Sequence, residues 1–168
     1  MKRLLFLILL GAIGAFFVRG FVIEGIYLAS DSMAPTLNTN DHVLVNKSTF
    51  FFRRPQRGEI VLLHAPQQPD KELVKRVIGV GGDQIEIRRK AVYLNGQKLD
   101  EPYARFAKPD VMFKGDNIDA LQIPSGYVFV MGDNRDFSGD SRDWKAANGD
   151  WSPYVPLKAV KGKIILNK

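Results

Sequence analysis

The spacing of apolar residues past position 23 most limits the folds open to this chain. These residues fall in short runs that alternate with polar residues or stand between glycines and prolines, and no helical period lasts longer than two turns. Such runs are typical of β-strands. The sequence therefore predicts an all-β domain with barrel-like sheets. The expected strands cover residues 42–46, 59–64, 72–80, 84–88, 91–94, 97–99, 127–131 and 161–166.

Two stretches between these runs carry their own expectations. Asn95 and Gly96 form a dipeptide that is a strong signal for a two-residue β-hairpin. Residues 103–122 mix aromatic, charged, Gly and Pro residues without a regular period. We expect this second stretch to be an extended excursion on the surface.

The first 23 residues form a separate apolar segment. Lys2 and Arg3 precede an uncharged, mostly apolar run over residues 4–18, which Arg19 ends, and apolar residues resume at 21–23. An uncleaved transmembrane anchor, a cleaved signal peptide and a buried helix can all have this pattern. No Ala-x-Ala triplet closes the run, which favours the anchor. The positive charges before it predict a cytoplasmic N-terminus, with the rest of the chain outside.

Length and composition set further limits. The 168 residues suffice for one domain with a short appendage, which divides the chain into an anchor over 1–23 and an extracytoplasmic domain over 24–168. The absence of cysteine excludes disulfides and thiolate metal sites. The net charge is +6, but the basic residues are scattered, so nucleic acid is not an expected partner. Two histidines without cysteine make a poor metal site, and no cofactor is expected.

A serine-containing octet over residues 30–37 follows the apolar segment closely. Its composition fits an ordinary polar turn. It also fits a nucleophilic serine, but such a serine needs a base within hydrogen-bond reach, and the octet contains none. His42 and His64 are the first candidates for that base, although each lies in an expected strand without an acidic neighbour. A Ser-His-Asp triad stays open, because triads assemble in space rather than in sequence.

Lysine is the other candidate base, provided that burial lowers its pKa. In the expected strand over 72–80, a period of two puts Lys75 on the same face as Leu73 and Val77. Arg76 lies on the opposite face, but a guanidinium does not usefully give up its proton. The alternative is an edge strand with two solvated charges.

The segment over residues 132–142 alternates acidic residues with arginines after an expected strand. It could be a solvated loop. It could also be a rigid loop cross-linked by carboxylate–guanidinium pairs, which can be bidentate. Such a loop could hold a second hydroxyl, Ser138 or Ser141, against a catalytic amine.

These segments, in this order, resemble the signature motifs of the type I signal peptidases of bacteria. Gly81 stands where many members of that family have proline. The resemblance runs from about residue 30 to residue 163, and its motifs cover residues 32–37, 57–61, 75–83, 132–142, 156–158 and 162–163.

The resemblance implies a membrane-bound serine endopeptidase with a Ser/Lys dyad and a fold of antiparallel sheets with a conical barrel. Its substrates would be the signal peptides of exported preproteins, cut after small residues at the outer face of the bacterial plasma membrane, with no metal. Ser32 would be the nucleophile, Lys75 the neutral general base, and Ser30 an oxyanion donor beside the Ser32 N–H. Ser138 would orient the lysine. The remaining motif positions would give structural support: Asp133, Arg135, Asp140 and Arg142.

Apolar residues around the octet suggest contact with the membrane interface. Tyr27, Leu28 and Met33 are expected to reach it, together with the aromatic run over residues 50–52. The alternative from another functional class is a tethered β-domain that binds peptides without cleaving them. That alternative does not explain the co-occurrence of the octet, the strand lysine and the acidic–arginine loop.

Overall fold

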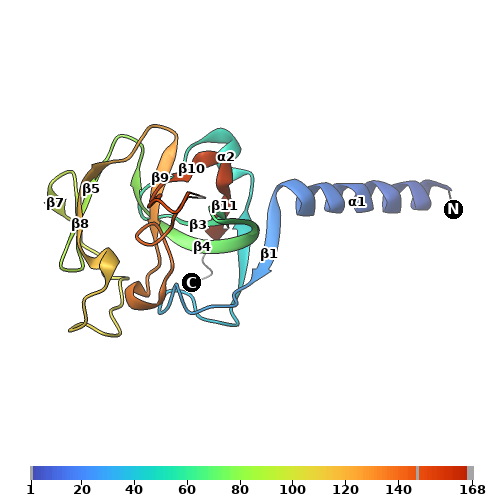
Figure 1. The fold of residues 1–168 in the computed structure, drawn as a ribbon. Coiled ribbons are helices and arrows are strands. Elements are labelled where there is room, and N and C mark those ends of the chain that lie inside the picture. The colour runs from blue at the N-terminus through green and yellow to red at the C-terminus, as the bar shows by residue number, and fades with distance from the viewer. Residues whose placement is uncertain (1, 147, 166–168) are drawn as a thin grey trace.

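The structure, a computed structural model, describes residues 2–146 and 148–165. A long helix, α1, projects from a β-rich body (Figure 1). The strands come after this helix in the chain and form the body. The elements in chain order are α1 (Lys2–Phe21), β1 (Ile23–Tyr27), β2 (His42–Asn46), α2 (Thr49–Phe52), β3 (Ile60–Ala65), β4 (Gln68–Val80), β5 (Gln84–Arg88), β6 (Ala91–Leu94), β7 (Gln97–Lys98), η1 (Lys114–Asp116), β8 (Ile118–Gln122), β9 (Tyr127–Met131), η2 (Arg135–Phe137), β10 (Val155–Pro156), η3 (Leu157–Ala159) and β11 (Val160–Ile165).

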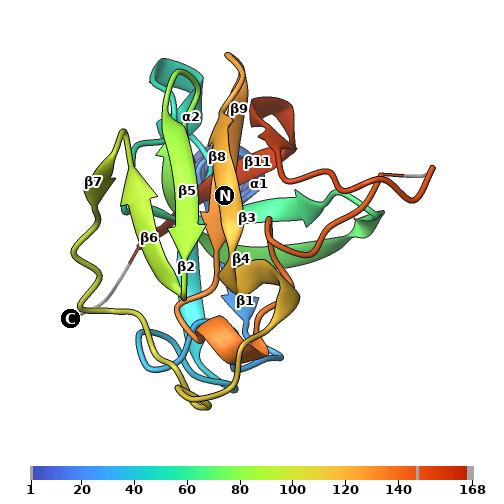
Figure 2. The ribbon, with the colours of Figure 1, turned by 60° about the vertical axis from the view of Figure 1, so that its left-hand side comes forward.

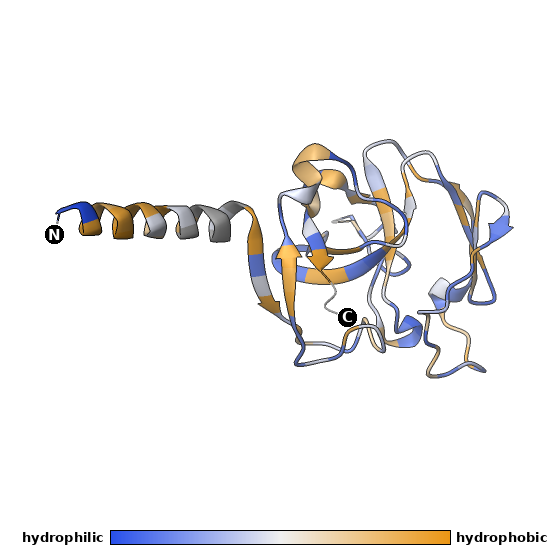
Figure 3. Cartoon of the chain, turned by 180° about the vertical axis from the view of Figure 1, so that it is seen from behind, coloured by the Kyte–Doolittle hydropathy of each residue, from blue (hydrophilic) through white to orange (hydrophobic). Residues whose placement is uncertain are grey.

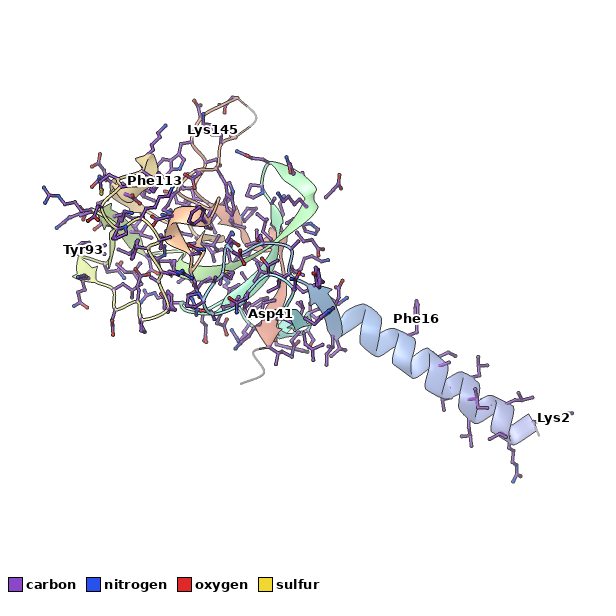
Figure 4. All side chains as sticks on the ribbon, turned by 90° about the horizontal axis from the view of Figure 1, so that it is seen from below. Lys2, Phe16, Asp41, Tyr93, Phe113 and Lys145 are labelled. Atoms are coloured by element: carbon purple, nitrogen blue, oxygen red, sulfur yellow. The ribbon has the colours of Figure 1, made fainter. Side chains whose placement is uncertain are left out.

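Helix α1 is rich in leucine, a strong helix former. Its described apolar side chains face away from any other element, as Figure 4 shows for the labelled Phe16, which is 78% exposed. Among the residues that the structure describes, no helix is both long enough and apolar enough to cross a membrane.

Seven strands form the larger sheet, in the order β1-β2-β11-β3-β4-β9-β10, and every pairing in it is antiparallel. Four more form an antiparallel sheet in the order β7-β6-β5-β8, which faces the viewer in Figure 2. The predicted hairpin at Asn95 and Gly96 is confirmed. Both residues have positive φ, as a type I′ turn requires, and Leu94 pairs with Gln97 across it.

The all-β expectation is confirmed for the domain, but the expected barrel is wrong for the described residues. Both sheets are open, because β1 and β10 end one of them, and β7 and β8 end the other. The stretch 103–122 is also more than a surface excursion. It contains β8, which pairs with β5, and its Asp116 is buried. Position 166, the last of an expected strand, lies outside the described residues.

Strand β4 lies at the centre of the packing. From Val74 to Gly79 both of its faces are buried. Val74 packs in a cluster with β2, β3, β11 and the loop over 28–37, whereas Ile78 packs against the four-stranded sheet. Val77 packs in a third cluster with β3 and β9. A charged side chain on this part of β4 is therefore held in an apolar and rigid setting.

Candidate active site

The serine octet forms the loop between β1 and β2. Met33 and Leu37 are buried in the core, and the Leu37 N–H donates to the Met33 carbonyl at 3.0 Å. The Asp31 carboxylate accepts hydrogen bonds from the Thr39 hydroxyl at 2.6 Å and from the Thr39 N–H, and these bonds lower its pKa. The loop is thus held both by apolar packing against the core and by the hydrogen bonds of Asp31.

In this loop the hydroxyls of Ser30 and Ser32 lie next to one another. Ser32 is half-buried, Ser30 is exposed, and their Oγ atoms are 3.3 Å apart. The expectation that Leu28 and Met33 reach the membrane interface is wrong, because both are buried in the core. Tyr27 is exposed.

Lys75 comes from β4, opposite Val61 of β3, on the face that also carries Val77. The residue is only 2% exposed. Burial is the main reason that its pKa falls from 10.5 to about 8; Asp140 raises the value somewhat and Arg142 lowers it. Below pH 8, holding this ammonium in the fold costs on the order of 3 kcal/mol of stability. That cost disappears as the pH rises from about 8 to 10.5, because the unfolded chain then loses the proton as well.

Ser30, Ser32 and Lys75 line one cleft of about 590 Å³. Residues 26 and 27 at the end of β1, and the two residues that follow them, form part of its wall. Phe137 and Trp144 also line this cleft, and the sequence analysis did not single them out. An exposed aromatic beside Ser138 in an otherwise polar loop was the available signal for Phe137.

The loop after β9 packs directly onto the loop that carries Ser32. Gly132 has no room for a Cβ, which would collide with the Ser138 side chain and with the Ser32 carbonyl oxygen. The Asn134 N–H donates to that same carbonyl at 3.1 Å. Ser32 and Ser138 are therefore brought together across the Gly132 backbone, although they lie far apart in the sequence.

The Ser138 hydroxyl has an unusual position. Within the described residues its Oγ is buried and has no hydrogen-bond partner. It lies close enough to Asp140 to help lower the pKa of that carboxyl, but outside the geometry of a hydrogen bond. A buried hydroxyl is unfavourable when it is left unpaired, so this oxygen has the capacity for a further hydrogen bond.

Asp140 and Arg142 form a buried, bidentate pair with distances of 2.9 and 3.0 Å. Burial alone would raise the pKa of Asp140, but Arg142 and the Gly132 N–H hold it below its usual value. Arg142 also donates to the Arg135 carbonyl at 2.6 Å. The pair therefore fixes both ends of the loop that carries Ser138.

Two further ion pairs involve partners that the sequence analysis missed. Asp133 accepts two hydrogen bonds from Arg76, at 2.8 and 2.6 Å, and a third from the Thr36 hydroxyl at 2.5 Å. Arg135 pairs with Glu101 at 3.0 Å. Arg76 could have been found, because a guanidinium beside Lys75 in an apolar strand needs a carboxylate. Nothing in the sequence pointed to Glu101.

Neither histidine lines the cleft that holds Ser32 and Lys75. His42 is exposed at the start of β2, where its ring packs against Tyr27 with the centroids 5.1 Å apart. His64 lies in β3, directly opposite Glu72.

Comparison with known proteins identifies the family. Residues 1–167 match the family described as "Signal peptidase, peptidase S26". The chain is 37% identical over 139 residues to the "Probable signal peptidase I-1" of Synechocystis sp., covering 79% of this chain and 68% of that protein. It is 36% identical over 133 residues to "Signal peptidase I S" of Bacillus subtilis, covering 76% and 71%.

A solved structure agrees with these matches. The crystal structure of a signal peptidase I from Enterococcus faecalis has a TM-score of 0.51 and 31% identity, and the match covers 66% of this chain and 97% of that one. The resemblance to type I signal peptidases is thereby confirmed. The chain belongs to the signal peptidase family, peptidase S26, and is a serine peptidase.

Proposed function

We propose that this protein is a membrane-bound endopeptidase that removes signal peptides from exported preproteins after small residues, with Ser32 as nucleophile and Lys75 as general base. One observation carries the dyad: Ser32 shares a cleft with a buried lysine whose pKa is about 8. Such a lysine is neutral in a useful fraction at physiological pH, whereas an ordinary lysine is not. The signal peptidases I among its relatives support the substrate class.

The proposed reaction proceeds through an acyl-enzyme. Neutral Lys75 takes the proton from the Ser32 hydroxyl as its oxygen attacks the scissile carbonyl. The Ser32 N–H and the Ser30 hydroxyl, whose Oγ lies 3.3 Å from that of Ser32, donate to the developing oxyanion. The lysine ammonium then protonates the leaving amine, which frees the mature protein. Lys75 then deprotonates a water molecule, which attacks the ester carbonyl. The lysine ammonium returns this proton to the Ser32 oxygen as the ester bond breaks, and the signal peptide leaves with a new C-terminal carboxyl group.

Ser138 takes the role of a positioning residue in this proposal. Its unpaired, buried Oγ can accept a hydrogen bond from the Lys75 amine. Asp140 and Arg142 hold its loop, and the pair between Asp133 and Arg76 ties that loop to the residue after Lys75. The base and the nucleophile would then keep their separation during turnover.

Incubating the detergent-solubilised protein with a preprotein should give two products. Sequencing the new N-terminus of the larger product should place the cut directly after a small residue that follows the apolar core of the signal peptide. A preprotein that is retained intact would instead support the peptide-binding alternative.

We also propose that residues 1–23 form a single-pass anchor with a cytoplasmic N-terminus, and that residues 24–168 form the catalytic domain outside the membrane. Two observations support the anchor. Lys2 and Arg3 precede the apolar run, and the described leucines of α1 are exposed along the helix with no protein partner. Members of this family are membrane-associated in bacteria.

The full chain should sediment with membranes and stay there after a carbonate wash, because a spanning segment is not displaced by high pH. Release by carbonate would indicate a helix that only lies on the surface. A mature N-terminus near Ala15 would show instead that the segment is a cleaved signal.

A further inference from the structure

The short helix α2 lies beside the base of α1. Strand β1, which begins two residues after α1 ends, pairs with β2 so that Ile23 lies opposite Asn46. The Lys47 N–H donates to the Val22 carbonyl at 2.8 Å, and the Lys47 amine pairs with Glu24 at 3.3 Å. Helix α2 begins two residues after Lys47. The site where α1 leaves the body is therefore tied to the start of α2.

Helix α2 exposes two aromatic rings that nothing in the described chain covers. Phe51 is 71% exposed and Phe52 is 89% exposed, while Phe50 is partly buried against the core. Figure 3 shows the apolar character of this turn and of α1. Burying one such ring contributes about 1.5–3 kcal/mol of favourable free energy. A partner that buried both rings would therefore gain a substantial part of its binding free energy from them.

The charges around α2 favour an anionic partner. Four cations lie on or next to this segment, against two carboxylates, so the surplus is 4 − 2 = 2 positive charges. The cations are Lys47, Arg53, Arg54 and Lys163, and the carboxylates are Glu24 and Glu59. Arg53 and Lys163 both contact Glu59. Basic groups next to exposed aromatics are the composition that binds the interface of an anionic bilayer.

We propose that α2 is a second membrane contact, in which Phe51 and Phe52 enter the boundary between headgroups and acyl chains while Arg54 remains among the phosphates. The proposal rests on the anchoring role given above to residues 1–23. With α1 as the only membrane contact, the catalytic domain could rotate about the axis of that helix. A second contact beside the anchor would fix the orientation of the domain.

The fixed orientation has a consequence for the substrate. Strand β2 runs from Asn46, next to α2, to His42, where the loop that carries Ser32 ends. Its four residue steps correspond to about 14 Å, at roughly 3.4 Å per residue. The end of the loop that carries Ser32 is thereby held at about that distance from the proposed contact. A fixed orientation of the domain would then also fix how the cleft is presented to a preprotein in the bilayer.

The chain contains no cysteine, so one introduced cysteine can carry a single environment-sensitive label. Full-length Phe52→Cys protein, labelled with a nitrobenzoxadiazole dye, is reconstituted in vesicles of phosphatidylethanolamine and phosphatidylglycerol. Its emission should shift to the blue and be quenched by lipids with a nitroxide near the headgroup. The matched control is Lys98→Cys, at an exposed site on β7, whose label should stay in water. Both proteins should still cleave a soluble peptide, which shows that they are folded.

A second measurement tests the effect on activity. Full-length Phe51→Ser/Phe52→Ser protein should still float with the vesicles, but lose on the order of tenfold in kcat/KM on a preprotein inserted in them. Cleavage of a soluble peptide should stay unchanged, because neither ring lines the cleft.

The outcomes separate the two proposals. Protein that floats with an unquenched label at position 52 overturns the α2 contact and leaves the anchor intact. Protein that does not float overturns the anchor and, with it, the α2 contact. A disulfide-linked dimer of unlabelled Phe52→Cys protein would assign the surface to a second copy of the chain and overturn lipid as its partner.

Discussion

Replacing Ser32 with alanine should lower kcat/KM for a preprotein by about 10⁴-fold or more, down to the residual activity of an enzyme without its nucleophile. The proposed reaction has no other group that can form the acyl-enzyme, since Ser30 lies beside Ser32 as a donor and Ser138 is buried. The loop should keep its structure, because Met33 and Leu37 anchor it rather than the hydroxyl. The rate is measured by product formation, and folding by thermal unfolding in detergent.

Ser125→Ala is the matched control, because this serine is exposed and lies outside the cleft. It should cleave at the rate of the unchanged protein. If the Ser32→Ala protein still cleaved the preprotein at more than a trace and gave the same product N-terminus, Ser32 would not be the nucleophile.

Lys75 should be as indispensable as Ser32, and arginine should not replace it. Both Lys75→Met and Lys75→Arg should lose on the order of 10³-fold or more in kcat/KM. Methionine has no basic nitrogen, and a guanidinium keeps its proton at any accessible pH. The arginine variant separates a general base from a purely structural cation, because a site that needed only a positive charge would accept arginine.

The pH profile of the unchanged protein provides the second readout of Lys75. The base works only when it is neutral, so kcat/KM should rise about tenfold per pH unit below pH 8 and level off above it. At pH 7 about a tenth of the enzyme would hold the free base, roughly 300-fold more than with an unperturbed lysine. His42→Ala and His64→Ala should follow the same profile, because neither histidine lines the cleft. An inactive histidine variant beside an active Lys75→Met would replace the dyad with a histidine-based triad.

Much of the fold could be predicted, because local pattern decides it. The strands β2, β5, β6 and β9 begin and end where the sequence analysis expected, since each is an apolar or alternating run between turn residues. The Asn95–Gly96 hairpin follows from the backbone preferences of two residues. The period of β4 also put Lys75 on the face of Val77, but it did not predict that the structure buries both faces of the strand there.

The missed elements depend on partners that are distant in sequence. Strand β1 contains Gly25 and Glu24 and becomes a strand through its pairing with β2. Strand β10 has two residues and exists only as the partner of β9. The strands of the described residues do not close into the expected barrel, because closure depends on how edge strands meet, which no local period encodes.

The same limit applies to the candidate site. The alternation of acidic residues and arginines within residues 132–142 predicted carboxylate–guanidinium pairs in general, and the family resemblance implied structural support from Asp140 and Arg142, which the structure pairs. The partners of Asp133 and Arg135 lie 57 and 34 residues away, and only the folded sheet brings them together. The unpaired hydroxyl of Ser138 is likewise a property of packing, because it depends on how closely the Gly132 backbone approaches.

The pairing of β1 with β2 also bears on whether the enzyme can process itself. Its own apolar N-terminal segment resembles the substrates proposed for it, yet the residues that follow are held in five consecutive register positions from Ile23 to Tyr27. Leu28 continues this restraint through hydrogen bonds with Asp41 and Asn40. To enter its own cleft the segment would have to leave the sheet that supports the loop carrying Ser32. Under the proposed mechanism, cleavage within one molecule would disrupt the active site before the cut, so we expect any autoproteolysis to take place between two molecules.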